Sequence, residues 1–243
     1  MLGSIFRKKK QFEGLLSDVD MHSHLLPGID DGVDSLEEAI EVIKGFQHLG
    51  YRKLVTTPHI MHDFYRNTPE NILPLLEEVK QAVARENIPI ELEAAAEYYL
   101  DEHFIDLIDT DAPLLSFGNN YVLFELSFAA RPLNLREAIF NLQTKGYKPI
   151  LAHVERYLYF HKNIDELVEL KNTGIYYQLN LLSLSGYYSK GVRQMAQKLV
   201  NQGLIDFIGS DCHNGNQLIS LSQVLNSAEM NVLTTTRLLN DTI

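Results

Sequence analysis

The sequence predicts an α/β protein folded as a closed or nearly closed β/α barrel of seven units. Three observations lead to this prediction: doubly apolar strands alternate with helix patterns, glycines separate most helices from the next strand, and polar side chains follow almost every strand. Doubly buried strands that alternate with helices are typical of a parallel sheet. Seven such units in 243 residues suit one barrel better than two domains, and a doubly wound open sheet is the alternative.

The predicted strands are short and apolar, and they cover residues 19–21, 54–56, 90–96, 121–126, 150–152, 176–179 and 206–208. Four of the helix-to-strand junctions carry a glycine, at Gly50, Gly146, Gly174 and Gly203. Glycine just past a helix adopts the left-handed conformation that ends helices. The repeated junction therefore indicates repeated helix-to-strand units.

The helices have recognisable starts. Ser35 and Glu38 form a capping-box pattern, and an apolar stripe with the helical period follows it as far as Leu49. Thr68 and Pro69 begin the next helix, because proline is tolerated in the first turn. Shorter helices are expected at 135–145, 164–172 and 191–202.

Composition excludes several classes of protein. Hydrophobic residues make up 45% and charged residues 22%, as in ordinary globular proteins. A net charge of −11 argues against a nucleic-acid partner. The single cysteine excludes an internal disulfide framework and fits a reducing compartment, and no apolar stretch is long enough for a transmembrane helix. We therefore expect a cytoplasmic protein with a basic N-terminal arm (1–17) and one catalytic domain (18–243).

Histidines and carboxylates collect at the carboxyl ends of the predicted strands and in the loops that follow them. In parallel β/α folds these ends share one face, which holds the active site. We therefore expect side chains that are distant in sequence to converge there as metal ligands. The candidates are His22, His24, Asp31, His59, Glu97, Glu125, His153, Asp211 and His213.

The residue types indicate divalent ions. Histidine and carboxylate ligands without a thiolate suit manganese, iron, zinc or magnesium. Nine ligands are too many for one ion and suit a cluster of two or three. Four carboxylates in one pocket would be strongly unfavourable without cations. Such ions would attract a phosphate group and lower the pKa of a water molecule that attacks it.

Arg156 lies three residues after His153, where its guanidinium is expected to hold phosphate oxygens. A cysteine-dependent phosphatase would need an arginine six residues after its cysteine, but Leu218 stands at that distance from Cys212. No phosphate-binding glycine-rich loop with its lysine is present either. The sequence therefore favours metal-assisted over cysteine-based phosphate chemistry.

Seven motifs together resemble the bacterial protein-tyrosine phosphatases of the PHP (polymerase and histidinol phosphatase) superfamily, which are found with capsule and exopolysaccharide synthesis genes. The resemblance covers about residues 18–214. The motifs are DMHSH (20–24), DDG (30–32), TPH (57–59), AEYY (96–99), FE (124–125), AHVERY (152–157) and SDCHN (210–214).

The resemblance implies a distorted, TIM-like (β/α)7 barrel of the PHP fold with a trinuclear site, typically of Mn²⁺, at the C-terminal face of the strands. It implies a first ion held by His22, His24, Glu97 and Asp211, a second by Glu97, Glu125 and His153, and a third by Asp31, His59 and His213. Arg156, Asp211 and His213 form the expected catalytic group. The implied substrate is a phosphotyrosyl protein, the tyrosine-rich tail of a bacterial tyrosine kinase that controls polysaccharide export.

The sequence departs from the family pattern at one place, and two alternative functions stay open. Many relatives carry an arginine soon after the last motif, but residues 215–224 contain none, and Gln217 or Arg131 is the expected substitute. A small-molecule phosphomonoesterase of the histidinol-phosphatase type is the first alternative, because metal ligands do not encode the leaving group. A catalytically silent metal-binding module is the second. The oligomeric state is left open by the sequence.

Overall fold

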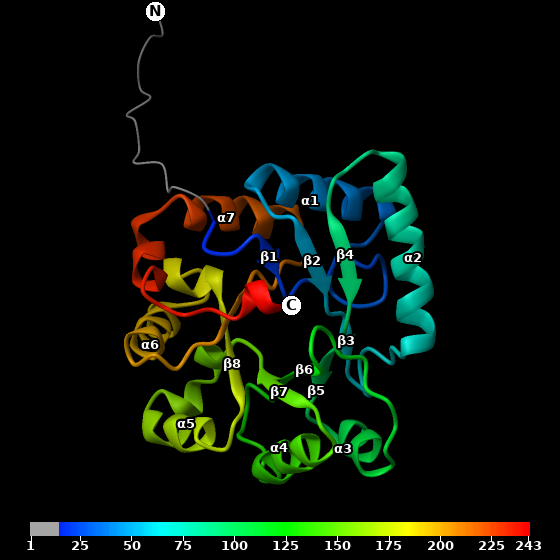
Figure 1. The fold of residues 1–243 in the computed structure, drawn as a ribbon. Helices are drawn as coiled ribbons and strands as arrows, with labels where there is room; N and C mark the ends of the chain where they lie inside the picture. Colours follow the sequence, from blue (N-terminus) through cyan, green and yellow to red (C-terminus); the bar gives the residue numbers. More distant parts are fainter. Residues whose placement is uncertain (1–14) are drawn as a thin grey trace, which may run out of the picture.

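The strands curl into a distorted barrel with the helices on its outside, as the computed structural model shows (Figure 1). The structure describes residues 15–243. The expected N-terminal arm (1–17), with its basic run, lies almost entirely outside the described residues. The prediction of a distorted (β/α)7 barrel is confirmed, because seven helices alternate with seven runs of parallel strand within residues 15–243.

The strands form two sheets, ordered β1-β2-β4 and β3-β5-β6-β7-β8-β9, and every pairing between these named strands is parallel. Most strand residues are buried, as the apolar runs predict. Their bounds are β1 (Val19–Asp20), β2 (Lys53–Thr56), β3 (His59–Ile60), β4 (Glu91–Ala94), β5 (Glu97–Tyr99), β6 (Tyr121–Glu125), β7 (Lys148–Leu151), β8 (Tyr176–Asn180) and β9 (Phe207–Gly209).

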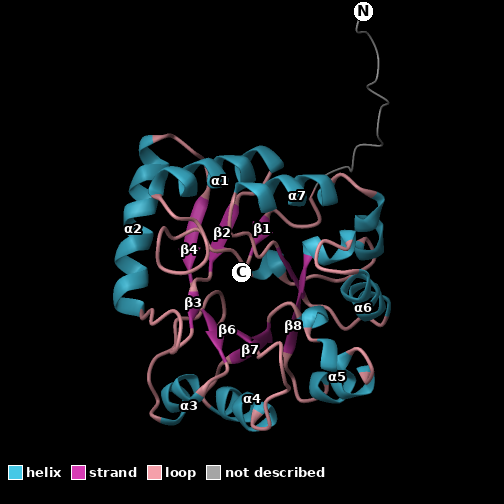
Figure 2. Ribbon diagram, turned by 180° about the vertical axis from the view of Figure 1, so that it is seen from behind, coloured by secondary structure: helices cyan, strands magenta, loops and turns pink. Residues whose placement is uncertain are grey.

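Each strand run is followed by one helix, and the helices surround the strands when the molecule is seen from behind (Figure 2). Of the seven, α3 and α7 were not predicted from the sequence. The bounds are α1 (Leu36–Leu49), α2 (Pro69–Arg85), α3 (Glu102–Asp109), α4 (Leu135–Thr144), α5 (Ile164–Lys171), α6 (Lys190–Asn201) and α7 (Gly215–Leu225).

The predicted helix ends are present. Ser35 Oγ accepts a hydrogen bond from the Glu38 N–H at 3.2 Å, while the Glu38 carboxylate reaches one residue further back, to the Asp34 N–H at 3.1 Å. Gly50 closes α1 with a φ of 97°, in the left-handed region, and the three other junction glycines also have positive φ. The sequence pattern was therefore a reliable guide to where helices stop.

Two predicted strands are interrupted, and the interruption shapes the site. The predicted strand 54–56 continues past Pro58 as β3, and the predicted strand 90–96 is divided into β4 and β5. Pro58 has no N–H for a sheet hydrogen bond, so the ladder breaks there and its neighbour breaks at the same level. Beyond the break, His59 pairs in register with Glu97. Two candidate ligands thus begin strands side by side.

The barrel is closed between β1 and β9. At its carboxyl end, the His24 N–H donates to Cys212 O at 2.9 Å and the Asp211 N–H donates to His22 O at 2.8 Å. At the other end, the buried Asn240 amide donates to backbone oxygens of Val19 and Ile208, at 3.1 and 2.7 Å. These contacts bring the first and last strands together and hold their candidate ligands in one place.

None of the helices in residues 15–243 combines the length and the hydrophobicity that crossing a membrane requires. The apolar side chains instead pack between the strands and the helices, where Phe46, Phe104 and Phe124 are at most 1% exposed. Many of the buried polar side chains lie outside this core, at the carboxyl ends of the strands.

Candidate metal centre

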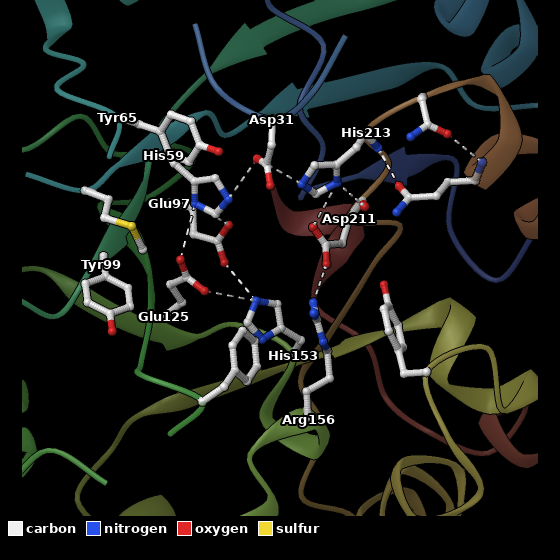
Figure 3. A pocket seen from close by; sticks show the side chains of 15 residues that line it. Asp31, His59, Tyr65, Glu97, Tyr99, Glu125, His153, Arg156, Asp211 and His213 are labelled. Carbon is white, nitrogen blue, oxygen red and sulfur yellow. Dashed lines mark hydrogen bonds and ion pairs between the residues drawn. The ribbon is translucent and has the colours of Figure 1, made fainter. Parts of the chain in front are cut away.

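The nine candidate ligands meet at the carboxyl ends of the strands, around a pocket of about 530 Å³ (Figure 3). His22 and His24 are 0% exposed and lie behind the residues that line the pocket, whereas Asp31 lines it with a side chain that is 52% exposed. The residues that line the pocket are Asp31, His59, Met61, Tyr65, Glu97, Tyr99, Glu125, Phe128, His153, Arg156, Tyr188, Asp211, His213, Asn214 and Gln217.

Three groups of side chains each place their ligand atoms within 4.8 Å of one another. The ninth candidate, His153, has Nε2 3.0 Å from Glu97 Oε1 and 3.8 Å from Glu125 Oε2, so it adjoins the third group. The groups are His22, His24, Glu97 and Asp211; His24, Asp31, His59 and His213; and His59, Glu97 and Glu125.

The hydrogen-bond partners of His22 determine which way its lone pair points. Gln178 Oε1 accepts from the His153 backbone N–H at 2.7 Å, which identifies that atom as the amide oxygen. The same oxygen lies 3.1 Å from His22 Nδ1, so Nδ1 carries a proton and donates it. In the neutral ring, His22 Nε2 is therefore a bare lone pair, and it faces Glu97 Oε2 at 3.1 Å.

His24 repeats this arrangement. Its Nδ1 lies 2.8 Å from Asp30 Oδ2, an acceptor, which leaves Nε2 as the lone-pair nitrogen of the neutral ring. That nitrogen points at His22 Nε2 from 3.4 Å. Two lone pairs facing each other and a carboxylate repel unless a metal cation or an added proton lies between them. Burial lowers the pKa values of His22 and His24, but the neighbouring carboxylates outweigh it and raise both, so the site favours positive charge at this point. Acceptors that hold the outer nitrogen are also typical of metal-binding histidines, so this donor set fits a metal ion.

The buried carboxylates also need positive charge nearby if they are all to be ionised. Burial and the neighbouring Glu97 raise the pKa of Glu125 to about 8. Burial would raise the pKa of Glu97 too, but His22 and His59 outweigh it and lower the value well below its usual range. Burial and Arg156 lower the pKa of His153 to about 4, which leaves it neutral and able to donate a lone pair. The protein alone does not hold both glutamates ionised at neutral pH, whereas divalent cations would.

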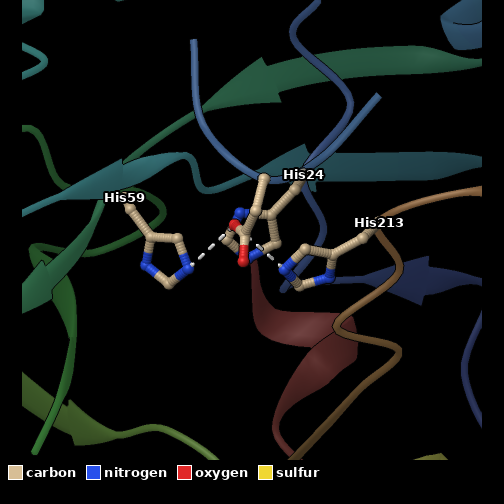
Figure 4. Close-up of side chains that lie close together, drawn as sticks. His24, His59 and His213 are labelled. Atoms are coloured by element: carbon tan, nitrogen blue, oxygen red, sulfur yellow. Dashed lines mark ion pairs between the residues drawn. The ribbon is translucent and has the colours of Figure 1, made fainter. Parts of the chain in front are cut away.

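The second group, of His24, Asp31, His59 and His213, combines the first residue of β3 with the loops that follow β1 and β9 (Figure 4). His59 Nε2 and His213 Nε2 lie 3.4 and 3.5 Å from the same oxygen of Asp31, and the ring of His24 stacks on His213 with centroids 4.0 Å apart. Hydrogen bonds from His213 and His59 lower the pKa of Asp31. His59 Nδ1 is buried without a hydrogen-bond partner among the described residues, which suits an inward-facing ligand atom.

Backbone strain marks two of the candidates. His153 has a φ of 33° and Asp211 a φ of 51°, both in the left-handed region that residues other than glycine seldom adopt. Such conformations cluster at functional sites, where surrounding contacts hold them. A short 3₁₀ helix, Val154–Arg156, follows His153 and turns the chain so that Arg156 comes back to the pocket.

Arg156 is held in a defined position beside Asp211. Its Nη1 donates to Asp211 Oδ2 at 2.9 Å, and Asn180 Nδ2 donates to the same oxygen at 2.9 Å. Asp211 Oδ1 is thereby directed at His22 Nε2, 3.3 Å away. Among the described residues, the Arg156 guanidinium makes this one hydrogen bond, and its remaining N–H groups are available for an anion in the pocket.

The suggested substitutes for the missing arginine have different surroundings. Gln217 lines the pocket, and its Oε1 accepts from the His213 N–H at 2.6 Å. Arg131 forms an ion pair with Glu166 and is not among the residues that line the pocket.

The one cysteine is a packing residue, as expected. Cys212 is buried, and burial raises the pKa of its thiol.

Sequence reasoning missed the residues that orient the candidate ligands. Asp30, Gln178 and Asn180 hold His24, His22 and Asp211, respectively. The sequence signal was weak: Asp30 adjoins Asp31, and Gln178 and Asn180 end a strand that otherwise carries no histidine or carboxylate. A polar residue at the end of that strand was the only sign that it contributes to the site.

Replacing Gln178 with leucine is expected to weaken Mn²⁺ binding by about 10–100-fold, because the acceptor that fixes the tautomer of His22 is lost. The dissociation constant for Mn²⁺, measured by titration of metal-free protein, checks this. Gln143→Leu is the matched control, since that amide bonds the Thr173 carbonyl outside the pocket. Equal affinity in the Gln178 variant and wild type would contradict the assigned role.

Comparisons of this chain with known proteins point to one family. Residues 18–224 match the family described as "Capsular polysaccharide synthesis, CpsB/CapC". CapC of Staphylococcus aureus is 32% identical over 213 residues, which cover 87% of this chain and 84% of that protein. The tyrosine-protein phosphatase YwqE of Bacillus subtilis (strain 168) is 31% identical, over 81% of this chain and 77% of its own.

A solved structure agrees with these relatives. It comes from work on YwqE of Bacillus subtilis and CpsB of Streptococcus pneumoniae, described as unique metal-dependent tyrosine phosphatases. It superposes on this chain with a TM-score of 0.80 at 28% sequence identity, over 88% of this chain and 85% of the other. The family match over residues 18–224 includes all seven strand runs and the nine candidate ligands.

Proposed function

Because the chain belongs to the CpsB/CapC family of capsular polysaccharide synthesis proteins and is a metal-dependent protein-tyrosine phosphatase, we propose that it acts on the tyrosine-rich tail of a bacterial tyrosine kinase. That kinase controls capsular or exopolysaccharide synthesis, and the reaction takes place in the cytoplasm. The observation that carries the proposal is the convergence of nine histidines and carboxylates on a pocket that also contains Arg156.

The nine side chains hold two or three divalent ions, with Mn²⁺ as the expected metal. His22, His24, Glu97 and Asp211 surround the first position, and their ligand atoms lie within 4.8 Å of one another. The second position lies beside Glu97 and Glu125, with His153 on one side and His59 on the other. Asp31, His59 and His213 surround the third. Glu97 borders the first two positions.

When bound, the ions supply positive charge that attracts the phosphate and lowers the pKa of water. The protein supplies the rest of the catalytic group, for which we propose Arg156, Asp211 and His213. Arg156 binds the phosphate oxygens through the N–H groups that Asp211 leaves available. Asp211 connects Arg156 to the histidines, and His213 forms the wall of the pocket beside Asp31. Phosphate is thereby held against the centre in one orientation.

A tail segment suits the shape and lining of the pocket. The mouth carries Met61, Tyr65, Tyr99 and Phe128, which can pack against an aromatic leaving group. Most of the metal-ligand candidates are buried, among them Glu97, Glu125 and His153, which line the pocket. A flexible tail can insert a single phosphotyrosine into such a pocket.

The kinetics of hydrolysis test the proposal. With Mn²⁺ present, we expect a higher kcat/KM for a phosphotyrosyl peptide taken from a kinase tail than for histidinol phosphate. Preference for histidinol phosphate would favour the small-molecule phosphomonoesterase instead. Protein that binds Mn²⁺ and hydrolyses neither ester would indicate a silent metal-binding module. Metal analysis of the protein purified without added ions identifies the native metal in the same preparation.

A further inference from the structure

Phe128 is an exposed aromatic residue at the pocket. It lies three residues after Glu125, in the loop that follows β6, and it lines the pocket. It is 45% exposed, which is high for a phenylalanine, although scattered exposed apolar residues are ordinary on protein surfaces. Its position, rather than its exposure alone, suggests a function.

Three groups fix the ring of Phe128. It stacks on the rings of His153 and Tyr157, with centroids 5.6 and 5.3 Å apart and interplanar angles of 28° and 25°. The guanidinium carbon of Arg156 lies 4.8 Å from its centroid. Tyr188 contacts the same guanidinium, at 4.3 Å. The ring is therefore held in one orientation, and little conformational entropy remains to be lost when a ligand packs on it.

This position is next to the path of the leaving group. Phe128 contacts both Arg156, which holds the phosphate oxygens in the proposed function, and His153, a proposed ligand. The aromatic ring of phosphotyrosine is joined to phosphorus through a single oxygen, so it lies directly beside the bound phosphate. Aromatic rings attract one another at centroid distances of about 4.5–7 Å, the range in which Phe128 already packs.

We propose that Phe128 contacts the aryl ring of the substrate and sets the preference of this enzyme for aryl over alkyl phosphate esters. The proposal rests on the proposed phosphatase function and adds the residue that recognises the leaving group. Three other aromatic residues line the pocket, of which Tyr65 and Tyr99 lie across it from Arg156 (Figure 3). The third, Tyr188, also contacts Arg156, but it is less exposed than Phe128 and its hydroxyl accepts a hydrogen bond from Asn180 Nδ2 at 2.9 Å. Tyr65 also stacks on His59, with centroids 5.5 Å apart.

Phe128→Leu tests the proposal, because leucine keeps an apolar side chain and removes the aromatic ring. The measurement is kcat/KM for two peptides of one sequence that carry either phosphotyrosine or phosphoserine, each relative to wild type and with Mn²⁺ present. We expect about a tenfold loss for the phosphotyrosyl peptide and a change of less than about twofold for the phosphoseryl peptide. Phe128→Tyr keeps the ring and is expected to retain the wild-type ratio.

Phe140→Leu is the matched control, since Phe140 is also exposed, at 66%, but lies on α4 outside the pocket. Inhibition by inorganic phosphate distinguishes two effects of the substitution. Phe128 could recognise the aryl ring of the substrate, or it could only hold Arg156 in position for the phosphate. The proposal predicts an unchanged inhibition constant in Phe128→Leu. An equal loss for both peptides together with weaker phosphate inhibition would overturn it, as would an unchanged ratio of the two activities.

The proposed function can fail separately from this inference. Wild-type enzyme that prefers the phosphoseryl peptide or histidinol phosphate would contradict the proposed function before any variant is made. Wild-type enzyme that hydrolyses the phosphotyrosyl peptide, together with a Phe128→Leu variant of unchanged selectivity, would overturn the role of Phe128 alone.

Discussion

Replacing Glu97 with glutamine is expected to lower kcat for a phosphotyrosyl peptide by roughly 10³-fold and to reduce the number of bound metal ions. Glu97 is 0% exposed, and its Oε2 lies 3.1 Å from His22 Nε2 and 3.3 Å from His59 Nδ1. Its Oε1 lies 3.0 Å from His153 Nε2. It therefore borders two proposed ion positions, and glutamine removes its charge while keeping its size. Steady-state kinetics and metal analysis of the same sample measure both effects.

Glu91→Gln is the control for this variant. Glu91 lies on β4, just before Glu97 in the chain, and its side chain is 58% exposed. The variant loses ion pairs to Arg52 and Lys53, and Lys53 keeps its second partner, Glu93. Activity near the wild-type level in Glu97→Gln, with unchanged metal content, would show that Glu97 holds no ion.

Replacing Arg156 with alanine is expected to raise KM for a phosphotyrosyl peptide by roughly 10–100-fold and to leave the metal content intact. The guanidinium lies in the pocket next to Asp211 and uses one N–H group for that carboxylate. Its loss removes charged hydrogen bonds to the phosphate, while Asn180 still holds the same oxygen of Asp211. Kinetics with saturating Mn²⁺, accompanied by metal analysis, measure this effect.

Arg136→Ala is the matched control, because Arg136 lies on α4 and pairs with Glu169 at the surface. Loss of metal from Arg156→Ala would contradict a phosphate-binding role. It would show that Arg156 acts through Asp211, as a residue that positions a ligand.

Much of the fold follows from local sequence patterns. The glycine junctions and the capping box located the helix ends, because these signals depend only on neighbouring residues. The helix α3 was missed, although Asp101 caps it by accepting from the Phe104 N–H. It has eight residues, as α5 has, but no glycine follows its end, whereas Gly174 follows α5. The break opposite Pro58 was missed as well, because it depends on how two strands align.

The candidate ligands were predicted because each stands at a strand end and carries a metal-binding group. Their partners could not be predicted in this way. Gln178 acts on His22, 156 residues away in sequence, and Asn180 acts on Asp211. Amide side chains have many ordinary roles, so only the folded arrangement reveals what they orient. The same holds for Phe128, whose neighbours come from a different strand end.

The central claim is that histidines and carboxylates from six of the seven strand runs bind several cations in one pocket. An anomalous difference map, recorded at the manganese absorption edge from crystals grown with Mn²⁺, tests this most directly. We predict two or three peaks among the nine side chains, with Glu97 next to two of them. Peaks only at other surfaces, with these side chains still bonded to one another, would contradict the account.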